Sequence, residues 1–177
     1  MISDTELPGV YTGRLDVHVD NRGFFTEMHR VPAVFSEKDD YYIHYVQHNM
    51  FYSEQRVLRG LHYQTIHPQG KFMMPVVGSI FHVVVDLRKE LPSYGKWFGR
   101  NLGLFEFIIS PKECMTGTVT TTENSLVYEM VTQYYYPGES VSVAWNDPDL
   151  GIAWPMEYPI LKEEDANGKS FKEVFGG

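Results

Sequence analysis

The chain has 177 residues and a formal net charge of −8, with no run of basic residues. This acidic balance argues against nucleic acid and anionic membranes as partners, because both attract basic proteins. The length is that of one domain, 1–177, and no stretch approaches the roughly 18 apolar residues of a membrane span. A single cysteine, Cys114, excludes an intrachain disulfide, and the first residues lack a signal-peptide pattern. We therefore expect a cytoplasmic protein.

The N-terminal part of the chain predicts short strands joined by tight turns. Alternation up to Val19 indicates one or two strands, and the sequence DNRG at 20–23 is typical of a turn, since Asn and Gly accept positive φ. An extended pattern resumes at Phe24. Residues 31–40 are the best candidate for a short helix, and the aromatic-rich run 41–52 predicts a strand.

Residues 80–88 alternate between two faces, as expected of a strand. One face is apolar, with Phe81, Val83, Val85 and Leu87, and the other carries His82, Asp86 and Arg88. That second face either meets solvent or lines the interior of a barrel wide enough for a polar ligand. The pattern alone does not decide between these alternatives.

Further strand patterns follow at 97–109, 118–122, 126–136 and 141–145, separated by residues that favour turns. The charged tail from Lys162 predicts a terminal helix or coil. Many short strands between regular turns predict an all-β fold, an antiparallel barrel or jelly roll with a few short peripheral helices.

The densest group of chemically useful side chains lies at 56–71, in the sequence RVLRGLHYQTIHPQGK. Arg59, His62, Gln64 and Lys71 supply two permanent positive charges, an imidazole and an amide. This set suits an anionic substrate with a proton to move. Taken alone, the segment slightly favours the alternative of surface charges around a structural histidine.

The sequence predicts no metal and no cofactor. Its seven histidines include no H-x-H pair, which a metal-binding barrel of this kind would use. The G-x-S-x-G, P-loop and G-x-G-x-x-G patterns are also absent, so a serine hydrolase and the common nucleotide folds lack support.

Seven segments carry a family resemblance and occur in this order: DNRGFFTE (20–27), YVQHN (45–49), VLRGLHYQ (57–64), QGK (69–71), VDLR (85–88), SYGKW (93–97) and WNDP (145–148). Together they resemble the dTDP-4-dehydrorhamnose 3,5-epimerase family, which consists of cupin-fold epimerases of nucleotide-linked 4-keto-6-deoxy sugars. The resemblance extends from about Pro8 to Asp165. It implies a metal-free jelly-roll barrel, usually a homodimer, with a nucleotide-diphospho sugar bound in the barrel mouth.

The family's chemistry gives the side chains roles. A 4-keto group acidifies the hydrogens on C3 and C5, so a base can form an enolate and an acid can return a proton to the opposite face. The resemblance makes His62 the base, Asp165 its orienting carboxylate and Lys71 the cation at the enolate oxygen. The residues that it places around the substrate are Arg22, Glu27, Gln47, Asn49, Arg59, Gln64, His82, Thr116 and Tyr135.

Three of the residues that the resemblance places in the pocket differ from the family pattern. Where the family usually reads P-x-G-F-A-H-G-F, residues 111–118 read PKECMTGT. Thr116 therefore replaces a second active-site histidine, and Thr118 replaces an aromatic residue. His82 stands where the family has an aspartate.

The proton-donating acid also differs. The family places a tyrosine on the strand before its Tyr-Tyr-x-Pro sequence. Counting back from Pro137 without a gap puts Glu129 at that position, whereas Tyr128 fits only if the strand carries one extra residue. Alternation puts Glu129 and Tyr135 on one face and turns Tyr128 away. Glu129 is the predicted acid, with Tyr128 as the alternative.

Three functions remain open. The first is an epimerase acting at C3, C5 or both, on a 4-keto-deoxy sugar or an altered sugar such as a heptose. The second is a 3,4-ketoisomerase that uses the same base, and the third is a non-catalytic sugar-nucleotide-binding homologue. The intact set of Arg59, His62, Lys71 and Asp165 favours the epimerase.

Overall fold

The computed structural model describes residues 2–28 and 44–176. The helix expected at 31–40 and the first three residues of the run 41–52 lie outside the described residues.

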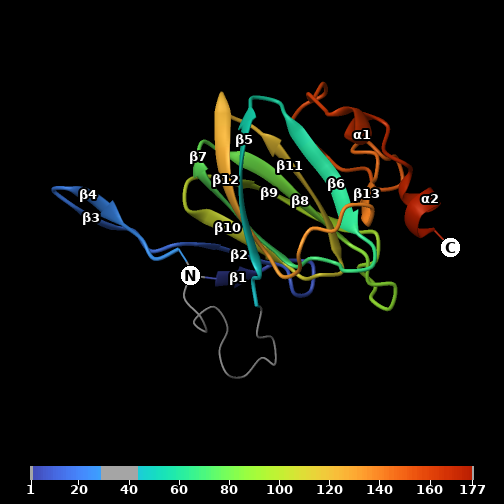
Figure 1. Ribbon diagram of the computed structural model, residues 1–177, viewed down its shortest axis with the longest axis horizontal. Helices are drawn as coiled ribbons and strands as arrows, with labels where there is room; N and C mark the ends of the chain where they lie inside the picture. The colour runs from blue at the N-terminus through green and yellow to red at the C-terminus, as the bar shows by residue number, and fades with distance from the viewer. Residues whose placement is uncertain (1, 29–43, 177) are drawn as a thin grey trace.

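Two antiparallel sheets pack face to face and enclose the core (Figure 1). The six-stranded sheet has the order β1 (Ile2–Asp4), β2 (Tyr11–Arg14), β10 (Glu106–Ser110), β7 (Lys71–Val77), β12 (Asn124–Val131) and β5 (Gln47–Glu54). The five-stranded sheet has the order β13 (Ser140–Ser142), β6 (Leu58–Gln64), β11 (Cys114–Thr120), β8 (Ile80–Asp86) and β9 (Trp97–Leu102). Consecutive strands such as β11 and β12 lie in different sheets, which is typical of a jelly roll. The predicted cupin-type fold is confirmed.

The polar face of strand β8 could meet solvent or line the barrel interior. Both faces of the strand are buried, which excludes solvent. Ile80 packs in the core between the sheets, and Val83 packs in a second cluster that includes a residue of the C-terminal helix. His82 is only 1% exposed. Buried Asp86 is held by Arg88, whose Nη2 lies 2.7 Å from the Asp86 carboxylate. The polar face of this strand therefore points into the barrel.

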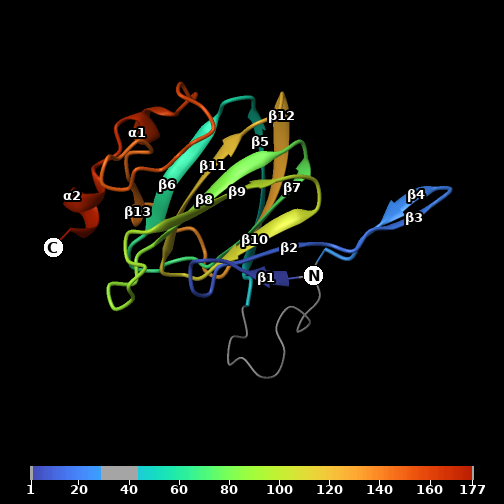
Figure 2. The same cartoon turned by 180° about the vertical axis from the view of Figure 1, so that it is seen from behind.

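Two short helices follow the last strand at the outer side of the five-stranded sheet (Figures 1 and 2). They are α1 (Glu163–Ala166) and α2 (Phe171–Phe175), so the charged tail does form terminal helices. A capping box between Ser170 and Glu173 starts α2, and buried Phe171 anchors it in the second cluster. Helix α1 carries one buried residue, Asp165, and this places a carboxylate against β6.

Strands β3 (His18–Asp20) and β4 (Gly23–Phe25) form a two-stranded ribbon that projects away from the barrel (Figures 1 and 2). The turn predicted at 20–23 is confirmed, since Asp20 accepts a hydrogen bond of 2.8 Å from the Arg22 backbone. Val19, Phe24 and Phe25 are between 60% and 78% exposed. An isolated hairpin is at best marginally stable in water. Exposed apolar side chains gathered on one element, as on this ribbon, are typical of a protein–protein interface.

Candidate active site

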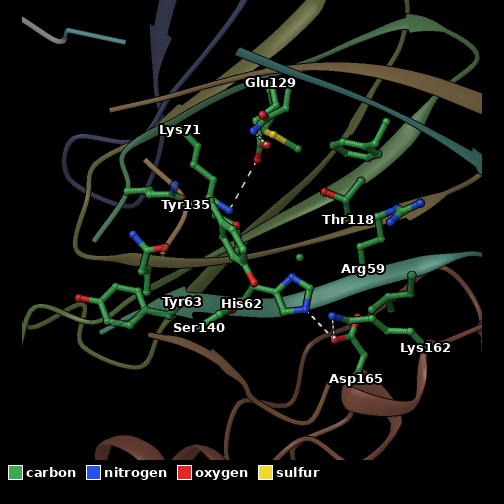
Figure 3. A pocket seen from close by; sticks show the side chains of 18 of the residues that line it. Arg59, His62, Tyr63, Lys71, Thr118, Glu129, Tyr135, Ser140, Lys162 and Asp165 are labelled. Atoms are coloured by element: carbon green, nitrogen blue, oxygen red, sulfur yellow. Dashed lines mark hydrogen bonds and ion pairs between the residues drawn. The ribbon is translucent and has the colours of Figure 1, made fainter. Parts of the chain in front are cut away.

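A cavity of about 530 Å³ opens between the two sheets. The six-stranded sheet contributes residues of β5, β7 and β12, and the five-stranded sheet contributes residues of β6 and β11. The segment 160–165 closes one side (Figure 3). This volume is in the range of small-ligand pockets.

His62 and Asp165 form a hydrogen-bonded pair on one wall of the cavity (Figure 3). The Nε2 of His62 lies 2.6 Å from Oδ1 of Asp165, and the buried carboxylate also accepts bonds from the backbone N–H of Gly60 at 3.1 Å and from Oγ of Ser142 at 3.2 Å. Burial alone would raise the pKa of Asp165, but the hydrogen bonds from His62 and from the backbone of Gly60, together with the positive charge of Lys162, hold that pKa below its ordinary value. Asp165 is therefore ionised and accepts from Nε2–H, which leaves Nδ1 of His62 for a substrate proton.

A local irregularity in β6 turns both Arg59 and His62 into the cavity. Residues three apart on a regular strand face opposite ways, but the pairing of β6 with β11 shifts register between these two positions. Gly60 makes the shift possible with a φ of 127°. A Cβ at Gly60 would lie 2.6 Å from Cα of Gly117 and 2.8 Å from the carbonyl oxygen of Thr116, so only glycine fits.

The opposite wall holds a chain of polar contacts that ends at Lys71. Its Nζ lies 3.7 Å from Oε1 of Glu129, and Asn49 donates a bond of 2.8 Å to Oε2 of the same carboxylate. Gln47 in turn donates to Asn49 at 2.8 Å and accepts from the backbone N–H of Tyr135 at 3.1 Å. Figure 3 shows Lys71 and Glu129 across the cavity from the His62–Asp165 pair.

The structure places Glu129, and not Tyr128, in the cavity. The hydroxyl of Tyr128 bonds to Nδ1 of His48 at 2.7 Å, and its side chain lies on the other face of β12 from Glu129. Residues 124–131 pair with β5 one to one, so the strand contains no extra residue opposite that neighbour. The ungapped alignment predicted this arrangement correctly.

Two cations lie on one side of His62 at the edge of the cavity (Figure 3). Arg59 donates to Oγ of Ser53 at 3.0 Å, and its guanidinium lies 5.2 Å from the centre of the Phe51 ring, which fixes its direction. Half-exposed Lys162, whose Nζ is 3.8 Å from Oδ1 of Asp165, also lines the cavity. The sequence analysis missed Lys162, because only the return of the chain through α1 brings it here.

The structure distinguishes the remaining predicted binding residues. Thr116 and Tyr135 line the cavity, as expected of substrate contacts. His82 does not: it lies fully buried, with Nδ1 2.6 Å from Oγ1 of Thr118. The expectation that His82 contacts the substrate directly is therefore wrong, because alternation predicts the face of a side chain but not its depth.

Gln64 lines the cavity, but it uses its amide on the backbone. The side chain donates to the carbonyl oxygens of His67 and Tyr134 and accepts from the N–H of Tyr136 at 2.9 Å. With both amide hydrogens bonded, Gln64 holds the loop that carries Tyr135, which lines the cavity.

Arg22 and Glu27 do not line the cavity of their own chain. Arg22 lies on the projecting ribbon, fully in solvent and paired with Asp20 at 2.6 Å. The prediction that these two residues complete this chain's own site is wrong for the single chain, since the sequence does not show that the ribbon leaves the barrel.

Within residues 2–28 and 44–176, no three His, Cys, Asp or Glu side chains are arranged to hold a metal ion. The helices of the same described ranges are also too short and polar to cross a membrane.

A jelly-roll barrel whose cavity sets a histidine–carboxylate pair against a lysine defines a cupin-fold enzyme of the kind that moves protons at carbon. The sequence identifies the family more closely. A family model described as dTDP-4-dehydrorhamnose 3,5-epimerase matches residues 4–173, and the chain belongs to this family.

Known proteins of the family are similar over almost the whole chain. The dTDP-4-dehydrorhamnose 3,5-epimerase of Methanothermobacter thermautotrophicus is 37% identical over 96% of this chain and 93% of its own length. The epimerase structure from Legionella pneumophila in complex with dTDP-4-keto-L-rhamnose has a TM-score of 0.90 and 31% identity, and covers 96% of this chain and 92% of that one. The structure of ChmJ, a 3'-monoepimerase from Streptomyces bikiniensis in complex with dTDP-quinovose, has a TM-score of 0.88 and 28% identity, and covers 98% and 89%.

Proposed function

We propose that this protein epimerises a nucleoside-diphospho-4-keto-6-deoxy sugar at C3, C5 or both. The observation that supports this function best is the placement of His62–Asp165 and Lys71–Glu129 on opposite walls of one cavity. Inversion at carbon needs a base on one face of the sugar and an acid on the other. The similar Legionella protein, which binds a dTDP-4-keto sugar, makes dTDP the first nucleotide to test.

The reaction begins when Nδ1 of His62 removes the hydrogen next to the 4-keto group. Asp165 stabilises the imidazolium that forms, and the ammonium of Lys71 stabilises the enolate oxygen. Glu129 then passes a proton taken from solvent to the same carbon from the opposite face, and the carbonyl re-forms. Asn49 occupies Oε2 of Glu129, so Oε1, on the side of Lys71, carries the transferred proton. Solvent restores both groups, and the step neither gains nor loses electrons.

Arg59 and Lys162 bind the diphosphate in this arrangement. Both side chains are cationic, both line the cavity, and both lie on the same side of His62 in Figure 3. Arg59 is held in place by Ser53 and Phe51, which lowers the entropy lost when it binds phosphate. A local pair of cations is required because the whole chain carries a charge of −8.

Solvent-deuterium incorporation tests the proposed function. Purified protein in D2O should place deuterium at C3, C5 or both in dTDP-4-keto-6-deoxyglucose, and NMR should detect the inverted centre. Movement of the carbonyl from C4 to C3 would establish the ketoisomerase instead. Binding of the nucleotide sugar without any exchange would establish the non-catalytic alternative.

The homodimer also belongs to the proposal. Arg22, which the family resemblance places near the diphosphate or sugar, lies outside its own chain's cavity on a ribbon with exposed Val19, Phe24 and Phe25. A two-fold partner that buries this ribbon would gain an apolar interface and receive Arg22 at its cavity. The cytoplasmic location remains a prediction.

Mixing two inactive variants tests this assembly. Arg22→Ala and His62→Asn homodimers should each be impaired, whereas an exchanged mixture should recover up to about a quarter of wild-type activity, since one cavity of each mixed dimer has both residues intact. Light scattering should report a dimer for the wild type and a monomer for Phe25→Asp. A monomeric wild type, or no recovery on mixing, would contradict the shared site.

A further inference from the structure

Inside the barrel, at the five-stranded wall of the cavity, lies a buried polar pair that the proposed reaction does not use. His82 on β8 is the register partner of Thr118 on β11, and its Nδ1 lies 2.6 Å from Oγ1 of Thr118. His82 is fully buried, whereas Thr118, which is 5% exposed, lines the cavity. The threonine thus stands between the histidine and any ligand.

The histidine of this pair is neutral. Burial, and to a smaller extent the positive charge of Lys71, lowers the pKa of His82 to about 3. Near pH 7 the ring therefore carries a single N–H, on either Nδ1 or Nε2.

The surroundings of the ring select Nδ1 for that hydrogen. Among residues 2–28 and 44–176, Nε2 of His82 has no hydrogen-bond partner. A hydrogen on Nε2 would be a buried donor without an acceptor, which costs free energy, whereas a hydrogen on Nδ1 has the Thr118 hydroxyl as its acceptor. Nδ1–H therefore donates to Oγ1 of Thr118, and the hydrogen of the Thr118 hydroxyl is free to be donated to a ligand.

Thr118 lies within the length of one sugar ring from the predicted base, His62. Thr116, two residues earlier on β11, is the register partner of His62. Residues two apart on a strand are separated by about 7 Å, roughly the span of a pyranose ring with its substituents. A sugar carbon held at His62 would therefore bring another position of the same ring to Thr118.

We propose that Thr118, oriented by His82, donates a hydrogen bond to an oxygen substituent of the bound sugar and selects sugars that carry oxygen at that position. His82 acts as a positioning residue and Thr118 as a specificity residue. The inference rests on the proposed function, since it assumes that a nucleotide sugar occupies the cavity. A binding site with a dedicated donor discriminates strongly, because a ligand without the matching oxygen leaves a buried donor unbonded.

Calorimetric titration with two ligands tests the role of Thr118. The ligands are dTDP and dTDP-glucose, which is unreactive and carries the sugar hydroxyls. Thr118→Val should weaken dTDP-glucose about tenfold and leave dTDP unchanged, because one hydrogen bond to the sugar is lost. Thr118→Ser, the matched control, should bind both like the wild type. Unchanged affinity of Thr118→Val for both ligands, or equal loss for both, would overturn the proposal. A wild type that binds neither ligand contradicts the proposed function itself.

Substitution of the histidine tests its role in positioning. His82→Asn keeps a polar atom close to the place of Nδ1, whereas His82→Leu removes it. The Asn variant should keep the wild-type affinity for dTDP-glucose, and the Leu variant should lose about as much as Thr118→Val. Combining His82→Leu with Thr118→Val should cost no more than Thr118→Val alone, since both break one contact. Asn and Leu variants with equal affinities would show that His82 only fills space.

Discussion

His62→Asn should lower the rate of deuterium incorporation from D2O about a thousandfold, because a positioned general base contributes between about 10² and 10⁴ to the rate of proton transfer. His62 is the only histidine that lines the cavity among residues 2–28 and 44–176, so no described imidazole can take its place. The measurement is the exchange rate at each sugar carbon by NMR. Affinity for dTDP should remain at the wild-type value.

Asp165→Asn serves as the companion variant for this prediction. Asparagine keeps the shape of the carboxylate but removes the charge that stabilises the imidazolium. If its NH₂ group donates to Nε2, the hydrogen of His62 moves to Nδ1, which can then no longer accept the substrate proton. Exchange should fall at least about a hundredfold, within the range for loss of acid–base catalysis. Exchange at wild-type rates in both variants would exclude the His62–Asp165 pair as the base.

Glu129→Gln should separate exchange from inversion. His62 would still remove a proton and return deuterium to the same face, so exchange with retained configuration continues. Inversion should fall at least about a hundredfold, because the amide cannot deliver a proton to the opposite face. NMR of the recovered sugar nucleotide distinguishes the two outcomes, since deuterium at an unchanged stereocentre differs from the inverted product.

Tyr128→Phe is the matched control, one residue away on the same strand. Its hydroxyl bonds to His48 on the other face of β12, so its loss should leave inversion within about twofold of the wild type. If Tyr128→Phe abolished inversion and Glu129→Gln did not, the phenol would be the acid, and β12 would have to shift when the substrate binds.

Local patterns predicted much of this molecule. The alternation at 80–88 and the turn at 20–23 both have counterparts in the structure, because period-two patterning and positive φ are properties of a few neighbouring residues. The ungapped count to Glu129 also predicted the correct face. Residues 97–109, read as continuous strand material, contain β9 and β10 in different sheets, since the change of sheet depends on packing and not on propensity.

Long-range placement was beyond the sequence. Ser142 reaches Asp165 only because β13 pairs with β6. Lys162, three residues before Asp165, lines the cavity only because α1 packs on the same strand. The depth of His82 depends on Thr118 lying in front of it. The distance of Arg22 from the cavity depends on the direction in which the ribbon leaves the barrel. Each of these facts requires strand order, which hydrophobic periodicity does not encode.

The close approach at Gly60 links the chemistry of the site to the cooperativity of unfolding. The same glycine lies against the backbone of Gly117 and donates its N–H to Oδ2 of Asp165. Opening of the seam between β6 and β11 would therefore also break the support of the catalytic carboxylate. No partly unfolded state in which β6 and β11 have separated can keep the base in place. The amides of β6 should therefore lose their protection from hydrogen exchange in the same cooperative transition that abolishes enzymatic activity.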